Sequence, residues 1–224
     1  MTKGLSKAMG TKILVDADIL IKLSVLDCFE DSFGAIGLQI AETATLHSMT
    51  LSAGVRNAGV RMRKARSGAG ASRLLSTLTT IPTIDRLDQV ELQLSASLIK
   101  ASQQLGLAVD GGEAILVSIC IHRNISLLTT GDKRAIRSLP LISRCVPQVA
   151  SLGSKVIPLE GLLLKLTQKV GLATLLTRFN ANSGCDGALE HALMIADGDQ
   201  VVFEHELKRR LSTLRRTAGN YLAC

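Results

Sequence analysis

Six acidic residues stand where the chain could bring carboxylates together around a metal ion. Asp16 and Asp18 directly follow the apolar run KILV, at the expected end of a buried strand. Carboxylates at such a position are costly unless a cation compensates them. The other acids occur where later elements are expected to converge: Glu42, Asp110, Glu113 and Asp132. The set predicts a site for a divalent cation such as Mg²⁺, which prefers oxygen ligands.

Four of these acids also have an ordinary structural interpretation. Asp16 could cap the helix that follows its strand, and Asp132 could cap the helix that begins at GDKRA. Glu113 suits a helix N-terminus in either role, because the helix dipole favours an acid there. Glu42 could be a solvated residue on the surface of a helix. The metal site therefore depends on whether the fold brings these side chains together.

The elements that would position the acids follow an α/β pattern. Apolar segments predict strands at residues 12–15, 81–84, 126–130 and 154–160. The spacing of apolar residues predicts helices at 19–28, 36–49, 85–106, 110–122 and 131–139, with Asp85 as the N-cap of the third. This alternation predicts a parallel sheet with helices on both faces. Sites in such sheets lie beyond the carboxyl ends of the strands, where Asp16 and Asp132 fall.

The pattern changes near Gly161, after which the chain reads as helices without intervening strands. We expect an α/β domain over residues 1–160 and a helical extension over residues 161–224. In the basic segment HELKRRLSTLRRT, an apolar stripe predicts packing on the domain or on a partner chain. The stripe consists of Leu207, Leu211 and Leu214.

Composition and charge limit the class of protein. Hydrophobic residues make up 46% of the 224 residues, which excludes wholesale disorder and allows a full core. The formal net charge of +7 favours polyanionic partners. The five cysteines contain no C-x-x-C pair, so neither a zinc ribbon nor a disulfide framework is indicated. Charged residues interrupt the apolar run 13–26, unlike a signal peptide or membrane span, and we expect a cytoplasmic protein without membrane contact.

Basic residues collect in a stretch that contains no acid. Between Glu42 and Asp85 the charged residues are all basic: Arg56, Arg61, Arg63, Lys64, Arg66 and Arg73. The stretch is rich in Gly, Ala and Ser and has poor apolar periodicity, which predicts a mobile loop or a frayed helix. Two interpretations stay open: a solvated loop, or a surface that binds phosphates and releases counterions on contact with RNA.

Four segments, in order, resemble the motifs of PIN-domain nucleases. They are ILVDADILI, IAETA, DGGEAIL and LLTTGDKRA, and the resemblance covers residues 12–160. PIN domains are small α/β nucleases, best known from bacterial toxin–antitoxin pairs and RNA-processing factors. The resemblance implies cleavage of single-stranded RNA with Mg²⁺ or Mn²⁺. It also implies a role as the toxin of a toxin–antitoxin system, an inhibitory protein partner and a homodimer.

The resemblance assigns roles by position. It implies catalytic roles for Asp16, Glu42, Glu113 and Asp132, and metal binding by all of these except Glu42. Asp18 stands where small PIN toxins often carry Asn, and we expect it and Asp110 to support the site. Asp110 could also substitute for Glu113 as a ligand.

Neighbouring residues are candidates for contacts with the substrate. Thr129 or Thr130 could orient a carboxylate or a phosphate, and Lys133 and Arg134 could contact the scissile region. The basic stretch adds four candidates for binding RNA phosphates: Arg61, Arg63, Lys64 and Arg66.

Two other classes of protein fit part of the pattern. A haloacid-dehalogenase-type phosphatase also carries D-x-D after its first strand, with Asp16 as nucleophile and Asp18 as general acid. Against this class, Leu20 stands where Thr or Val is expected, and the DGGEA helix has no counterpart. The third class is a PIN-like scaffold without catalysis that binds RNA or protein through its basic surface.

Overall fold

The computed structural model describes residues 10–52, 55 and 57–223, and its strands form one five-stranded parallel sheet. The strand order is β3-β2-β1-β4-β5. The strands are β1 (Ile13–Val15), β2 (Thr43–Leu46), β3 (Thr83–Ile84), β4 (Leu127–Thr130) and β5 (Val156–Pro158). The predicted α/β class with a parallel sheet is confirmed.

Helices make up most of the described chain. Those that follow the first three strands are α1 (Ala17–Val25), α2 (Phe29–Ala35), α3 (His47–Ser52), α4 (Ala58–Ala65), α5 (Gly68–Thr80) and α6 (Gln89–Gln104). The remaining helices, in chain order, are α7 (Gly111–His122), α8 (Lys133–Cys145), α9 (Leu159–Val170), α10 (Leu172–Asn180), α11 (Gly187–Ala196) and α12 (Gln200–Ala218). Short 3₁₀ turns occur at η1 (Ile40–Glu42), η2 (Pro147–Leu152) and η3 (Gly219–Tyr221).

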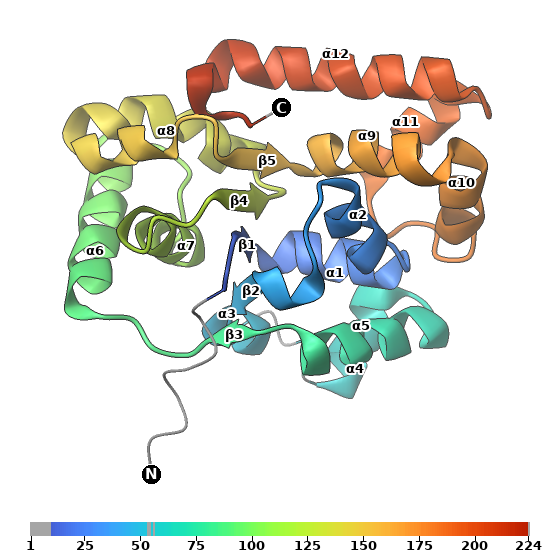
Figure 1. Ribbon diagram of the computed structural model, residues 1–224, viewed down its shortest axis with the longest axis horizontal. Helices are drawn as coiled ribbons and strands as arrows, with labels where there is room; N and C mark the ends of the chain where they lie inside the picture. The colour runs from blue at the N-terminus through green and yellow to red at the C-terminus, as the bar shows by residue number, and fades with distance from the viewer. Residues whose placement is uncertain (1–9, 53–54, 56, 224) are drawn as a thin grey trace.

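Two hydrophobic cores lie on opposite faces of the sheet. Successive side chains of a strand point to opposite faces, and accordingly Ile13 and Val15 join one core while Leu14 joins the other. The first core is closed by α1, α2, α5 and α9–α12, and the second mainly by α6, α7 and α8. Figure 1 shows these two groups of helices on either side of the central strands. Helices therefore cover both faces, as the sequence predicts.

The prediction of a helix over residues 36–49 is wrong, because the chain forms η1, strand β2 and the short helix α3 there. Strand β2 pairs with β1 on one side and β3 on the other, and all four of its residues are buried. Thr45 donates a hydrogen bond from Oγ1 to the carbonyl oxygen of Val15 over 2.8 Å. Thr43 and Thr45 make this strand hard to recognise in the sequence, because two of its four residues are polar although all four are buried.

Two local expectations are corrected at helix starts. Asp88, not Asp85, is the N-cap of α6, where its side chain accepts a hydrogen bond from the amide of Glu91 over 2.9 Å. The stretch expected to be a loop or a frayed helix forms α4 and α5. Asn57 and Ser67 cap these two helices and compensate for a sequence with weak apolar periodicity.

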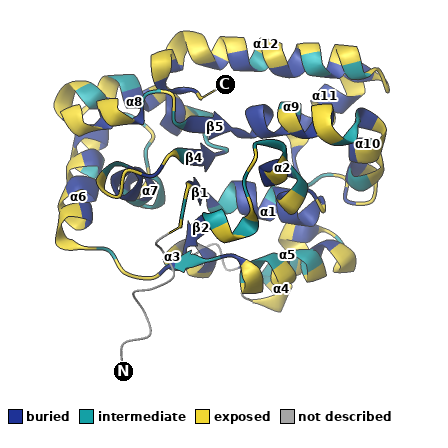
Figure 2. Ribbon diagram, in the orientation of Figure 1, coloured by how far each residue is buried: buried dark blue, intermediate teal, exposed yellow. Residues whose placement is uncertain are grey.

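The segment after residue 160 is helical, as expected, and it packs against the sheet. Phe203 and Leu207 of α12 belong to the same core as β1 and α1. Leu211 and Leu214 are also buried, which confirms the predicted apolar stripe. Figure 2 shows the exposed outer face of α12 opposite its buried inner face. No helix within the described ranges is both long and apolar enough to cross a bilayer.

Candidate functional site

A cleft of about 560 Å³ opens at the carboxyl ends of β1, β4 and β5. The chain passes from β1 to β2 and β3 on one side and places β4 and β5 on the other, so the cleft lies at the point where the strand order reverses. Seven acids line it: Asp16, Asp18, Asp110, Glu113, Asp132, Glu160 and Asp186. Its basic residues are Lys22, Lys133 and Arg134. The cleft is therefore strongly acidic in a basic protein.

Asp16 is the most buried of the predicted site acids, with 7% of its surface exposed. Although it is the N-cap residue of α1, its side chain makes no capping hydrogen bond. Instead its Oδ2 accepts a hydrogen bond from Thr130 Oγ1 over 3.0 Å. Burial raises the pKa of Asp16, with a further contribution from the charge of Asp18, while the bond from Thr130 opposes the rise. The geometry favours a functional role for Asp16 over a capping one.

Asp110 and Glu113 form a reciprocal capping box at the start of α7. Each carboxylate accepts a hydrogen bond from the other residue's backbone amide over 2.9 Å. Burial raises the pKa of Glu113 to about 7, and the charges of Asp110, Asp132 and Asp16 add to the rise. The structure thus brings Glu113 within electrostatic reach of both strand-end acids, and Asp110 lines the same cleft.

Asp132 caps α8 and lines the cleft at the same time. Its Oδ1 accepts hydrogen bonds from the amides of Arg134 and Ala135, over 2.7 and 3.2 Å. The Arg134 guanidinium pairs with Oδ2 over 2.8 Å. Burial would raise the pKa of Asp132, but the bonds from Arg134 outweigh it and lower the pKa. Capping and a site role are therefore compatible for this residue.

Asp18 is held at the side of the cleft by Lys22. The Lys22 ammonium lies 2.6 Å from Asp18 Oδ2 and 2.7 Å from Asp186 Oδ2, and it links α1 to the start of α11. A Cβ atom on Gly131 would clash with Asp18 Oδ2, so a larger residue at this position would displace the Asp18 carboxylate. These contacts suit the supporting role expected for Asp18.

Two acids of the cleft were missed in the sequence. Glu160 follows β5 just as Asp16 follows β1, and this pattern of an acid after a buried strand was the signal for it. Asp186 is the N-cap of α11 and gave no sign of its proximity to the other acids. Its place depends on the packing of α9–α12 against the α/β core. Sequence alone does not encode that proximity in any local pattern.

The structure separates Glu42 from the other predicted acids. Glu42 ends η1 and precedes β2, so it lies at the amino end of the sheet, opposite the cleft. Its carboxylate pairs with Lys12 over 2.6 Å and accepts a hydrogen bond from the amide of Gln39. These bonds, chiefly the one from Lys12, lower its pKa. The prediction that Glu42 joins the cluster is wrong, because the segment predicted as a helix contains strand β2.

The basic stretch contacts the segment that leads into α11. Arg63 and Lys64 are exposed on α4, whereas Arg61 donates a hydrogen bond to the carbonyl oxygen of Val55. The Arg66 side chain packs against Gly184, where an added Cβ would lie 3.5 Å from its atoms. Gly184 is two residues from Asp186 in the cleft wall. Arg56 lies outside the described residues.

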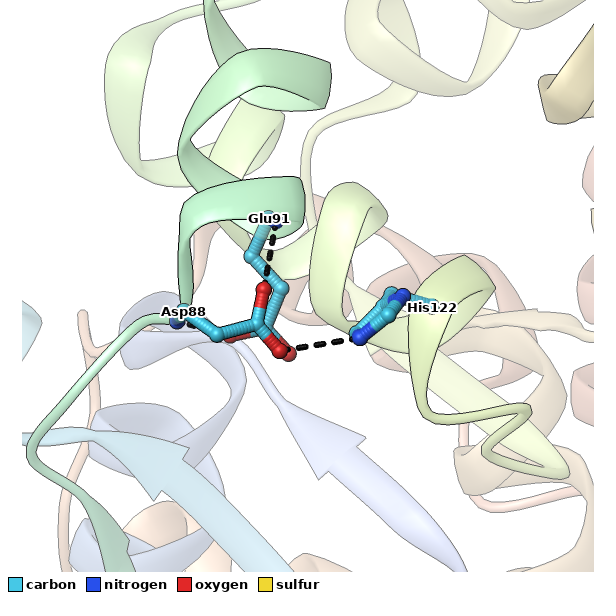
Figure 3. A group of neighbouring side chains, drawn as sticks. All are labelled: Asp88, Glu91 and His122. Carbon is cyan, nitrogen blue, oxygen red and sulfur yellow. Dashed lines mark hydrogen bonds and ion pairs between the residues drawn. The ribbon is translucent and has the colours of Figure 1, made fainter.

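A different group of metal-ligand types lies between α6 and α7 (Figure 3). The ligand atoms of Asp88, Glu91 and His122 all lie within 4.8 Å of one another. Every carboxylate oxygen already has a partner there: Asp88 binds His122 and the amide of Glu91, and Glu91 binds Arg123 and the amide of Asp88. We interpret this group as a structural tie between the two helices.

The charge balance of the cleft fits a divalent cation. Its basic residues all pair with acids: Lys22 with Asp18 and Asp186, Lys133 with Glu160, and Arg134 with Asp132. Within the part of the chain that the structure describes, the remaining cleft acids make no ion pair: Asp16, Asp110 and Glu113. In the structure, ligand atoms from these three acids do not all lie within 4.8 Å of one another. Mg²⁺ tolerates such spacing, because it usually takes only one or two carboxylates and keeps several waters.

Comparison with known proteins gave no matching family model, no matching curated protein and no matching solved structure.

Proposed function

We propose that the protein is a nuclease that depends on Mg²⁺ or Mn²⁺ and hydrolyses the phosphodiester bonds of single-stranded RNA. The observation that carries the proposal is the acidic cleft at the strand-order reversal, where Asp16 is buried without a basic partner. Buried carboxylates are stable as anions only when something compensates their charge. A divalent cation that also binds a phosphate would supply this compensation.

The proposed roles follow from what each side chain contacts. A bound cation lowers the pKa of a water molecule and stabilises negative charge on phosphate oxygens. Asp16 would hold the cation, because its hydrogen bond from Thr130 fixes one oxygen and leaves the other free of side-chain partners. Glu113 and Asp132 would complete the acidic surface. With a pKa of about 7 in the cation-free protein, Glu113 is also suited to accept a proton near neutral pH.

The location of the basic residues supports a nucleic-acid substrate. Helix α4 carries exposed Arg63 and Lys64, and its C-cap residue Arg66 lies beside Gly184, two residues before Asp186 of the cleft. A strand of RNA bound in the cleft could therefore place neighbouring phosphates against these residues, with release of counterions. Few aromatic residues are available for base stacking, so we expect binding through phosphates. A toxin role, an inhibitory protein partner and a homodimer stay predictions of the resemblance.

The phosphatase alternative is weaker. Its general acid would be Asp18, whose carboxylate pairs with Lys22 over 2.6 Å. That ion pair holds the Asp18 carboxylate against Lys22 at the side of the cleft, so it is not free to approach a leaving oxygen. The contacts of Asp18 thus argue against a phosphatase. A protein that binds RNA without cleaving it is distinguished by the RNA cleavage assay.

Cleavage of labelled single-stranded RNA tests the proposal. We expect cleavage by the wild-type protein with Mg²⁺ or Mn²⁺, none with EDTA, and a loss of at least about 100-fold in Asp16→Asn, since electrostatic stabilisation by one group is typically worth this much. Glu190→Gln, which removes an exposed acid of α11 that does not line the cleft, serves as the matched control and should stay active. Equal cleavage by wild type and Asp16→Asn would identify a contaminant. RNA binding without cleavage would leave only a binding role.

A further inference from the structure

Glu160 lies at the same level of the sheet as the predicted site acids. The register pairs Val15 with Thr129 and Thr130 with Pro158. Asp132 and Glu160 therefore each follow by two residues a position that is paired between β4 and β5. Because the strands are parallel, Asp16, Asp132 and Glu160 mark the carboxyl ends of three adjacent strands, and all three line the cleft.

Glu160 is buried, yet one of its carboxylate oxygens has no partner. Only 5% of the residue surface is exposed. Its Oε1 pairs with the Lys133 ammonium, while Oε2 accepts no hydrogen bond. Burying an oxygen of a charged group without a partner is unfavourable, so such an atom in a native structure requires an explanation, and a bound ion is one.

Asp186 is a buried acid of the same cleft whose carboxylate oxygens both have partners. It is 8% exposed and also pairs with a lysine. Its two oxygens are both occupied, one by Lys22 and the other by the amide of Leu189 over 2.6 Å. Burial and an ion pair therefore do not by themselves leave an orphaned oxygen, and the free Oε2 distinguishes Glu160.

We propose that Glu160 is a further cation ligand of this cleft, with Oε2 as the donor atom. The inference rests on the cation site of the proposed function and adds a third strand end to it. Oε1 stays with Lys133, which keeps that ammonium at the cleft for contact with an RNA phosphate. Strand β5 thus contributes an acid at the carboxyl end of the sheet, whereas Glu42 lies at the opposite end.

Binding of Mn²⁺ alone, measured without RNA from the electron paramagnetic resonance signal of the free ion, tests this proposal. We expect Glu160→Gln to weaken Mn²⁺ binding at least about 10-fold, the usual lower range for loss of a group that acts on a bound metal. Asp186→Asn removes a carboxylate of similar burial and pairing from the same cleft. If charge alone matters, both variants weaken binding equally. We expect Asp186→Asn to weaken binding less than Glu160→Gln, because both Asp186 oxygens already have partners and neither is left to bind an ion.

A second variant keeps the test decisive if Glu160→Gln does not fold. Lys133→Met removes the partner of Oε1 at a partly exposed position. It should tighten Mn²⁺ binding several-fold, because it frees a ligand oxygen and removes a positive charge. Lys22→Met, which removes a cleft charge that does not contact Glu160, is the control for the loss of charge alone. If Glu160 only holds Lys133 in place, Lys133→Met tightens Mn²⁺ binding no more than Lys22→Met, and that result would overturn the proposal.

The outcomes separate this inference from the proposed function. Absence of Mn²⁺ binding to the wild-type protein would overturn both. If Asp16→Asn weakens Mn²⁺ binding while Glu160→Gln matches Asp186→Asn, only the role of Glu160 is overturned and the cation site stands. Stronger weakening by Glu160→Gln than by Asp186→Asn supports the proposal.

Discussion

Protonation of Glu113 should make the stability of the cation-free protein depend on pH. Its pKa rises from an ordinary value of 4.5 to about 7, first because of burial and then because of neighbouring carboxylates. At 1.36 kcal/mol per pKa unit, this rise corresponds to at most about 3 kcal/mol in the free energy of unfolding, and solvent screening of this partly exposed carboxylate lowers the value. The folded protein binds this proton more tightly than the unfolded chain. Stability from this group is therefore present below pH 4.5, falls as the pH rises to 7, and stays low above it.

The substitution Glu113→Gln isolates this effect. Glutamine can keep the capping box with Asp110, because its carbonyl oxygen still accepts the backbone hydrogen bond. In chemical denaturation with EDTA, we expect the variant to be more stable than wild type at pH 8 by up to about 3 kcal/mol, and nearly equal to it at pH 4.5. Asp16, whose pKa is also raised, should leave a residual slope of the same sign in the variant.

Magnesium should reverse the cost of ionisation. We expect added Mg²⁺ to stabilise the wild-type protein more at pH 8 than at pH 5, because ionised carboxylates bind it better. Glu113→Gln should gain less from Mg²⁺ at pH 8, and the control Glu190→Gln should behave like wild type. The reasoning is refuted if wild type and Glu113→Gln lose the same amount of stability between pH 5 and pH 8 without metal.

Two further predictions concern the cleft wall and the basic helix. Gly131→Ala should displace Asp18 and lower nuclease activity about 10-fold or more, as measured by steady-state cleavage. Gly111→Ala is the control, because an added Cβ there meets no atom within 4 Å. It should keep activity and raise the free energy of unfolding by about 0.5–1 kcal/mol, as measured by thermal unfolding. Arg63→Glu, made in the inactive Asp16→Asn variant, should weaken RNA binding and make the dependence of binding on salt less steep, as measured by fluorescence anisotropy. Lys100→Glu changes an exposed residue of α6 and should have neither effect. Equal effects of the two substitutions would contradict phosphate binding by α4.

Local sequence patterns were sufficient for the features whose causes are local. An apolar run followed by acid placed Asp16 and Asp132 at strand ends, because a parallel sheet requires continuous apolar strands and ends them in polar residues. The apolar segment that follows DGGE placed Glu113 at the start of a helix, where the helix dipole favours an acid, and it lies in the first turn of α7. The parallel sheet itself followed from the alternation of these elements.

Only the tertiary structure decided which acids meet. Strand β2 is stabilised by pairing with β1 and β3, and its threonines gave no local sign of burial. Glu42 was therefore assigned to a helix facing the cleft, whereas it lies at the opposite end of the sheet. Asp186 reaches the cleft because α9–α12 share a core with β1, a contact between residues far apart in sequence. The position of Glu160 after a strand was visible in the sequence. That Lys133 pairs with one of its oxygens and leaves the other without a partner depends on how the fold places the starts of α8 and α9. Local chemistry determines what each residue can do, and long-range packing determines which residues act together.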